Sequence, residues 1–113
     1  MEYRYETVND VQKVSLDGRL VAACSEEFKS AMFSLLAKKQ KVVFDLSKMS
    51  HIDSAGLGVL VSILQWFNAN GGVMKLACLQ PRPKIVFDIT HVCRLFEIYD
   101  TLDAALESFN APA

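Results

Sequence analysis

The chain has 113 residues, of which 51% are hydrophobic and 22% charged, and its 12 basic and 13 acidic side chains leave a formal net charge of -1. This length fits one domain around one core, and the composition is that of an ordinary globular protein. The near-neutral charge provides no electrostatic footprint for nucleic acid, so we expect no direct nucleic-acid contact.

The sequence shows no targeting or metal-binding motif. Its first residues lack the basic region and apolar stretch of a signal peptide, and its longest mostly apolar segment, 57–67, is too short for a helix across a bilayer about 30 Å thick. We therefore expect a cytoplasmic protein without membrane insertion. Cys24, Cys78 and Cys93 form no C-x-x-C pair or Cys/His cluster, which predicts small buried hydrophobic residues rather than metal ligands.

The first 40 residues predict a hairpin and a helix. Two β-prone runs, 3–8 and 11–16, flank the turn dipeptide Asn9-Asp10, and Asp17-Gly18 closes the second run. Ser25 is then placed to cap a helix. The apolar positions of this helix recur at helical spacing: Phe28, Ala31, Met32, Leu35 and Leu36.

The next segments alternate between strand and helix. The apolar run 42–46 predicts a strand buried on both faces, a polar connection follows at 47–51, and a helix over 54–70 ends at Gly71-Gly72. A strand over 73–79 precedes a third helix that begins near Pro81 and Pro83. The expected inner face of this helix consists of Ile85, Val86, Ile89 and Val92.

The last segments are a short strand, 95–99, and a helix that Asp100 can cap. The predicted order is ββαβαβαβα, an α/β fold with helices packed against a mixed β-sheet. We expect a single domain over 1–110 and a C-terminal tail over 111–113.

The helix over 54–70 carries two apolar stripes, and one sheet face cannot cover both. Either a neighbouring helix buries the second stripe or part of it forms an exposed binding patch around Trp66. The two stripes consist of Leu57, Leu60, Val61 and Leu64, and of Val59, Ile63, Trp66 and Phe67.

The start of the same helix is the candidate functional site. Asp53 and Ser54 lie at its N-terminus, where either residue can serve as an N-cap. An anion is also favoured there, so a phosphate on Ser54 would be tolerated locally and would act on binding through repulsion and desolvation. Gly56 and Gly58 allow another backbone to approach closely, either in helix-to-sheet packing or at a partner surface.

Catalytic interpretations of these residues fail on geometry. His51, Asp53 and Ser54 are neighbours at one strand-to-helix turn and cannot form the relay of a hydrolase triad. The segment 55–58 resembles part of a dinucleotide-binding G-x-G-x-x-G turn, but Val61 replaces the last glycine. Asp45 is interpreted as a strand-end residue that caps or pairs near a loop. No acid/base pair or ligand set converges, so we predict neither an enzyme nor a cofactor.

The order of these features resembles the STAS domain, and specifically stand-alone bacterial anti-sigma-factor antagonists. The resemblance covers nearly the whole chain and rests on L-D-G-R-L at 16–20, V-V-F-D-L at 42–46, I-D-S-A-G-L-G at 52–58 and the closing segment 95–106. Two positions depart from the family pattern: Ala55 stands where a second hydroxyl is often found, and Val21 where a polar residue is common.

The resemblance implies a switch protein. Ser54 would be the phosphorylation site, and the unphosphorylated form would bind an anti-sigma factor that is itself a serine kinase, thereby releasing the sigma factor. A serine phosphatase would reset the switch. The implied docking residues are Val21, Asp53, Ala55, Gly56, Leu57 and Gly58. The alternative is a STAS adaptor subunit that docks on a lipid-transport ABC complex or a signalling scaffold without a sigma factor.

Overall fold

The computed structural model describes residues 1–110, and the tail expected at 111–113 lies outside the described residues. Five strands and four α-helices alternate along the described chain, and a short 3-10 helix precedes the last strand. Their bounds are β1 Glu2–Val8, β2 Val11–Leu20, α1 Ala22–Leu35, β3 Lys41–Ile52, α2 Ser54–Ala69, β4 Val73–Ala77, α3 Pro81–Ile89, η1 Val92–Arg94, β5 Glu97–Tyr99 and α4 Leu102–Ser108.

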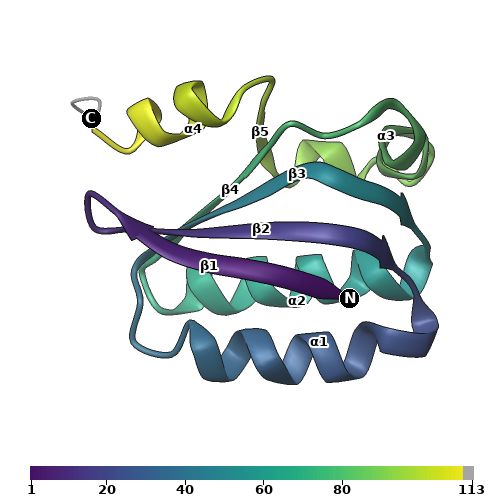
Figure 1. Ribbon diagram of the computed structural model, residues 1–113, viewed down its shortest axis with the longest axis horizontal. Coiled ribbons are helices and arrows are strands. Elements are labelled where there is room, and N and C mark those ends of the chain that lie inside the picture. Colours follow the sequence, from purple (N-terminus) through teal and green to yellow (C-terminus); the bar gives the residue numbers. More distant parts are fainter. Residues whose placement is uncertain (111–113) are drawn as a thin grey trace.

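One mixed sheet organises the fold, with its strands in the order β1-β2-β3-β4-β5. β1 pairs antiparallel with β2, while β3, β4 and β5 are each parallel to the preceding strand. Figure 1 shows α1 and α2 side by side along one face of the sheet and α4 on the other. The predicted ββαβαβαβα order and mixed sheet are confirmed.

The β1–β2 hairpin is longer than the sequence predicted. Its turn residues Asn9 and Asp10 have φ values of 48° and 72°, as a two-residue hairpin turn of positive φ requires. The prediction that Asp17-Gly18 closes β2 is wrong. Gly18, with φ 109°, accommodates a shift in the β2–β3 register, and the strand continues to Leu20.

β3 is also longer, because it follows β2 along this extension. The polar connection predicted at 47–51 is wrong, since Lys48, Met49, His51 and Ile52 all pair with β2. Met49 and Ile52 point into the core and explain why the strand persists. Asp45 therefore lies inside β3 rather than at its end, where its Oδ1 accepts a hydrogen bond from the Ser47 N–H at 3.0 Å.

The larger core lies between the sheet and the helix pair α1 and α2. Phe44, Leu46 and Leu76 supply its sheet side and are fully buried. The open question about the second stripe of α2 is settled by α1, because Phe33 packs edge-on against half-buried Trp66 with ring centroids 4.8 Å apart. A neighbouring helix therefore buries this stripe.

A smaller core lies beneath α4 on the opposite face. It joins Val11, Val43, Ala77 and Ala105. The cap of α4 is Thr101, whose hydroxyl accepts the Ala104 N–H at 3.1 Å, and not Asp100 as predicted.

Lys75 is buried beside this smaller core, with only 7% of its surface exposed. Its ammonium group donates to the Ser108 hydroxyl at 2.6 Å and lies 3.3 Å from a Glu97 carboxylate oxygen. It also lies 4.5 Å from the centroid of the Phe109 ring. These contacts compensate the buried charge and hold α4 on the sheet.

The predicted inner face of α3 is partly wrong. Ile85 and Ile89 are 57% and 72% exposed, whereas Pro83 and Phe87 are buried. Phe87 sets the orientation of this short helix, because its ring packs against Phe96 with centroids 5.9 Å apart. Val86 is half-buried beside it, and Val92, expected on the same helix, belongs to η1. The last strand begins at 97 rather than 95.

The three cysteines are half-buried rather than buried, which corrects the sequence prediction. Cys24 directs its sulfur toward the Arg19 and Val21 carbonyls at 3.4 Å. Burial, together with the nearby Asp45 carboxylate, raises the pKa of the Cys78 thiol, so this cysteine stays protonated at neutral pH. Across residues 1–110, no group of three or more His, Cys, Asp or Glu side chains is placed to hold a metal ion.

The orientation of α3 can be tested by stability measurements. Phe87→Ala should lower the free energy of unfolding by about 3–5 kcal/mol, because it removes a buried ring. Ile89→Ala on the same helix should change it by no more than about 0.5 kcal/mol, because this side chain is exposed. Urea unfolding followed by Trp66 fluorescence measures both, and similar losses in the two variants would contradict the observed orientation.

Candidate functional site

The candidate site lies where β3 ends and α2 begins. Asp53 is the N-cap of α2, with extended backbone angles, and its Oδ1 accepts the Gly56 N–H at 2.9 Å. Ser54 is the first residue of the helix and is exposed. The structure thus separates the two roles that the sequence left open, because Asp53 caps the helix and Ser54 is free for modification.

The same carboxylate also holds the start of α1. This helix begins at Ala22, so the prediction that Ser25 caps it is wrong; Ser25 is buried and its hydroxyl donates to the Ala22 carbonyl at 3.3 Å. The N-cap residue Val21 provides no side-chain cap. In its place Asp53 Oδ2 accepts the Ala22 N–H at 2.9 Å. One side chain therefore serves the N-termini of two helices.

These hydrogen bonds favour the ionised form of Asp53. The Gly56 N–H and then the Ala22 N–H hold the pKa of this carboxyl below its usual value, against the opposing effect of desolvation. Asp53 is therefore a fixed negative charge next to Ser54 at neutral pH.

Gly56 and Gly58 have different surroundings. A methyl group on Gly56 would collide with the Leu20 carbonyl oxygen, which no side chain can tolerate. The close approach at Gly56 is therefore made by β2, as helix-to-sheet packing. Gly58 is exposed, and a methyl group there would meet nothing within 4 Å. Only Gly58 leaves room for another molecule.

The docking residues that the family resemblance implies differ in their solvent exposure. Ser54 and Gly58 are exposed, while Val21, Asp53 and Ala55 are half-buried at the same helix ends. Gly56 and Leu57 are buried, and Leu57 retains only 4% exposure. The accessible surface is thus small and flat, because residues 22, 23, 55 and 58 are alanines or glycine.

A basic group adjoins this end of the sheet, and sequence reasoning did not connect it to the site. Arg82 lies with its Nη1 2.9 Å from Nε2 of His51. An arginine can only donate, so this His51 nitrogen accepts, and the other ring nitrogen, 3.0 Å from the Ser50 hydroxyl, carries the proton. Both nitrogens are thereby engaged away from Ser54, which agrees with the rejection of a catalytic triad.

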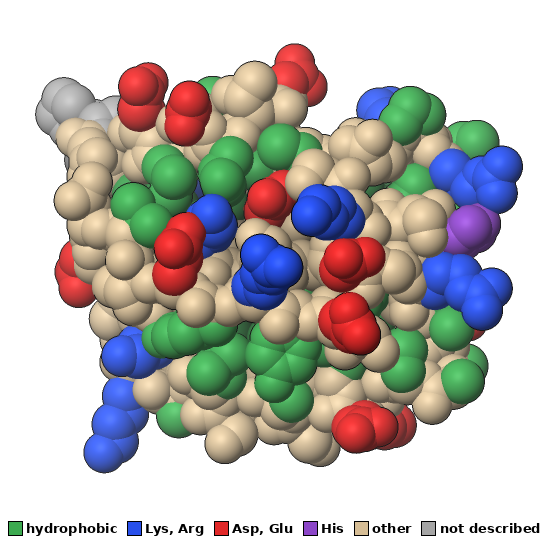
Figure 2. Space-filling view, in the orientation of Figure 1, with side chains coloured by type: hydrophobic (Ala, Val, Ile, Leu, Met, Phe, Trp, Pro, Cys, Tyr) green, Lys and Arg blue, Asp and Glu red, His purple; other side chains and the backbone are tan. Residues whose placement is uncertain are grey.

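Figure 2 shows basic and hydrophobic side chains gathered at the end of the molecule where α3 lies. On α3 itself the exposed side chains include Ile85 and Ile89, which are hydrophobic, and Arg82 and Lys84, which are basic. The periodicity of α3 could not reveal this surface, because its isoleucines were assigned to the core.

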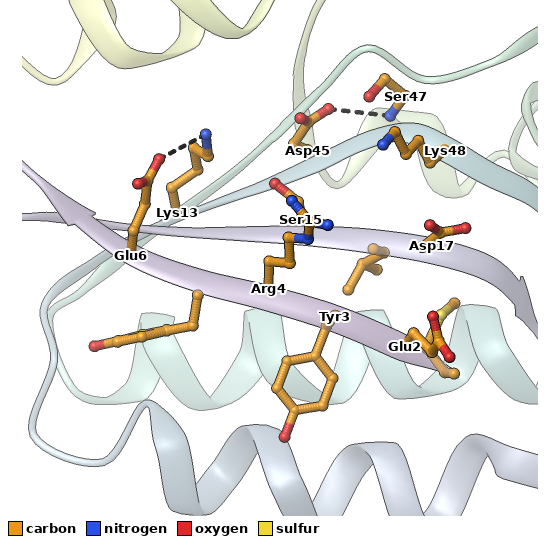
Figure 3. A pocket seen from close by; sticks show the side chains of 13 residues that line it. Glu2, Tyr3, Arg4, Glu6, Lys13, Ser15, Asp17, Asp45, Ser47 and Lys48 are labelled. Atoms are coloured by element: carbon orange, nitrogen blue, oxygen red, sulfur yellow. Dashed lines mark hydrogen bonds and ion pairs between the residues drawn. The ribbon is translucent and has the colours of Figure 1, made fainter.

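A groove of about 640 Å³ lies elsewhere, on the sheet face opposite α1 and α2. Figure 3 shows that its labelled side chains come from β1, β2 and β3. Acidic and basic groups are mixed along it, with Glu2, Arg4, Glu6, Lys13, Asp17, Asp45 and Lys48 among its lining residues. The groove is therefore a wide charged surface that is separate from Ser54.

Fold and site together define a small α/β domain with an accessible serine at a helix N-terminus. The STAS domain family model matches residues 2–105, which are nearly the whole chain. The chain belongs to the STAS domain family. No helix within residues 1–110 is long and apolar enough to cross a membrane.

Two relatives and one structure of the same fold illustrate the match. A protein of Thermotoga neapolitana named "Putative anti-sigma factor antagonist" homolog is 34% identical over 93% of this chain and 95% of its own length. A crystal structure of an antagonist so named from Thermotoga maritima has a TM-score of 0.91 and 30% identity, covering 96% and 95% of the two chains. Unphosphorylated SpoIIAA shares the fold, with a TM-score of 0.72 and 16% identity over 98% and 100%.

The contrast between the two glycines gives a stability prediction. Gly56→Ala should destabilise the protein by about 1–3 kcal/mol or more, because the new methyl group collides with the Leu20 carbonyl. Gly58→Ala should stabilise it by about 0.5–1 kcal/mol, because alanine is the better helix residue and the space is open. Urea denaturation compares the two, and a stable Gly56→Ala variant would contradict the packing of α2 on β2.

The capping role of Asp53 gives a pH prediction. Its folded-state pKa lies below the value of about 3.9 expected in the unfolded chain, so its contribution to stability is complete above that pH and is lost as pH falls through the folded-state pKa. Wild type should be more stable than Asp53→Asn by a constant margin at neutral pH. This margin should shrink below about pH 4. Urea unfolding at several pH values measures it, and a margin that grows in acid would oppose the assignment.

Proposed function

We propose that the protein is an anti-sigma-factor antagonist whose binding is switched off by phosphorylation of Ser54. The observation that carries the proposal is the exposed Ser54 at the first position of α2 in a STAS domain, directly after the capping Asp53. The names of its relatives support the class of function. In this role the protein is a binding partner and not an enzyme.

A phosphate on Ser54 fits the folded chain. The first turn of a helix favours an anion, and Ser54 is exposed, so the modification requires no rearrangement of the core. Both Asp53 oxygens already accept backbone N–H groups, so the phosphate does not have to replace the cap. We therefore expect the fold to survive modification.

The effect of the phosphate would fall on the docked complex. It adds a charge of roughly -1.5 to -2 beside the ionised Asp53. A partner surface in contact with Ser54 must then desolvate both the phosphate and the carboxylate. The small residues around Ser54 favour such close contact, because Ala55 and Gly58 leave the surface flat. Gly56 and Leu57 support this surface from below, and Val21 borders it.

The proposed partners follow from this switch. An anti-sigma factor with serine kinase activity would bind the unphosphorylated form and modify Ser54, and a serine phosphatase would reverse the modification. SpoIIAA, which has the same fold, has solved structures in unphosphorylated and phosphorylated forms. A partner that controls a sigma factor works in the cytoplasm, so we propose this location for the protein.

The switch can be tested with three forms of the full chain: wild type, Ser54→Ala and Ser54→Asp. Each is used to capture partners from the bacterium that produces it, and the captured kinase is purified for binding titrations. Wild type and Ser54→Ala should bind similarly, while Ser54→Asp should bind at least about tenfold more weakly because of the added negative charge. Intact-mass measurement should show one phosphate added to wild type and none to Ser54→Ala.

Ser34→Asp is the matched control, because Ser34 is also exposed but lies on α1. It should bind like wild type. Equal kinase binding by all forms would contradict the switch. Recovery of a membrane transport complex or a scaffold by all forms would instead favour the adaptor role.

A further inference from the structure

The first strand leaves a long edge of the sheet unpaired. β1 has seven residues and pairs only with β2, without a register shift along its length. Of the devices with which natural proteins protect such edges, it has charged side chains but no proline and no β-bulge. The opposite edge is β5, which has only three residues. Within residues 1–110, β1 is therefore the sheet edge best able to accept another strand.

The hairpin determines which backbone groups face this edge. In an antiparallel pair, opposed residues alternate between those that exchange hydrogen bonds and those that do not. Because the turn has two residues, Val8 and Val11 exchange hydrogen bonds with each other. The other even-numbered residues of β1 exchange hydrogen bonds with β2 in the same way. The N–H and C=O groups of Tyr3, Tyr5 and Thr7 consequently point toward the free edge.

The side chains of β1 alternate between two kinds of surface. Figure 3 shows Glu2, Arg4 and Glu6 on the groove face, and Tyr3 directed to the other face. Tyr3 and Tyr5 are 40% and 36% exposed, although both are large aromatic residues. The strand therefore presents alternating charges on one face and accessible aromatic rings on the other.

We propose that β1 pairs antiparallel with β1 of a second copy of this chain, centred on Tyr5. In this register Tyr5 faces its own copy, and Tyr3 faces Thr7 of the partner subunit. Tyr3, Tyr5 and Thr7 are the residues with free backbone groups. In this register all of those N–H and C=O groups become hydrogen-bonded across the twofold axis. Arg4 faces Glu6 of the partner subunit, and the symmetry forms this ion pair twice.

Other registers satisfy the strand less well. If the register between the two β1 strands shifts by one residue, the free backbone groups of one strand face groups of the other strand that are already bonded to β2. The register centred on Arg4 places this residue opposite itself and Glu2 opposite Glu6 of the partner subunit, so like charges meet. The register centred on Glu6 places two glutamates opposite each other and leaves the start of the strand unpaired. Only the Tyr5-centred register pairs the whole strand and matches every opposed charge.

The proposed dimer is independent of the switch. α2 follows β3, which is separated from the free edge of β1 by β2. Joining the two β1 strands would therefore form one continuous sheet and leave both Ser54 hydroxyls accessible. The prediction goes beyond the proposed function, because self-association is measured without any other protein.

Sedimentation velocity of the full chain over a wide concentration range tests this pairing. Wild type should show a concentration-dependent dimer. Arg4→Glu and Glu6→Arg should each raise the dimer dissociation constant by roughly tenfold or more, because each puts like charges together twice. A mixture of the two variants should form a heterodimer, since the side chains at positions 4 and 6 then carry opposite charges across the interface. The double variant R4E/E6R should dimerise again.

Ile89→Ser is the control for association through the exposed side chains of α3. It should dimerise like wild type, and circular dichroism should show every variant folded, because the substituted side chains are exposed. A wild type that stays monomeric at all concentrations would overturn the inference. Loss of the dimer in Ile89→Ser, or no association in the mixture of charge variants, would overturn it as well.

Discussion

A single carboxylate determines how the two long helices meet. Asp53 accepts the Gly56 N–H of its own helix and the Ala22 N–H of α1, so both helix N-termini share one fixed negative charge. The two helices therefore start at the same place, and the pairing of Phe33 with Trp66 further along depends on that common start. Ser54 is accessible because its neighbour, and not its own hydroxyl, provides the cap.

The parallel pairing of β2 with β3 makes this arrangement possible. Both strands end at the same edge of the sheet, where Leu20 pairs with Ile52. The Asp53 N–H then donates to the Leu20 carbonyl at 3.3 Å, and the same carbonyl oxygen leaves room for nothing larger than glycine at position 56. The glycine thus serves the fold, while the serine beside it is available to a partner.

The sequence predicted the order of elements and the location of the site because hydrophobic periodicity and helix signals are local. The sequence-based predictions were wrong where contacts with residues far away in the chain determine the local structure. Ser25 is a good cap by type, but Asp53 from another strand end occupies that role for α1. The 47–51 segment is polar yet forms a strand because β2 lies beside it. Ile89 is apolar yet exposed, because Phe87 fixes the rotation of α3. The His51–Arg82 contact joins residues 31 positions apart, which no local pattern reveals.

Lys75 holds α4 on the sheet and thereby sets the position of the last described residues. Asn110 borders the same small hollow as Asn9 in the β1–β2 turn, at the end of β2 remote from Leu20. A strand of ten residues separates these ends by about 30 Å. A fluorescent reporter or an affinity handle joined after α4 would therefore emerge on the far side of the molecule from Ser54. Surface immobilisation through that handle would orient the serine toward solution.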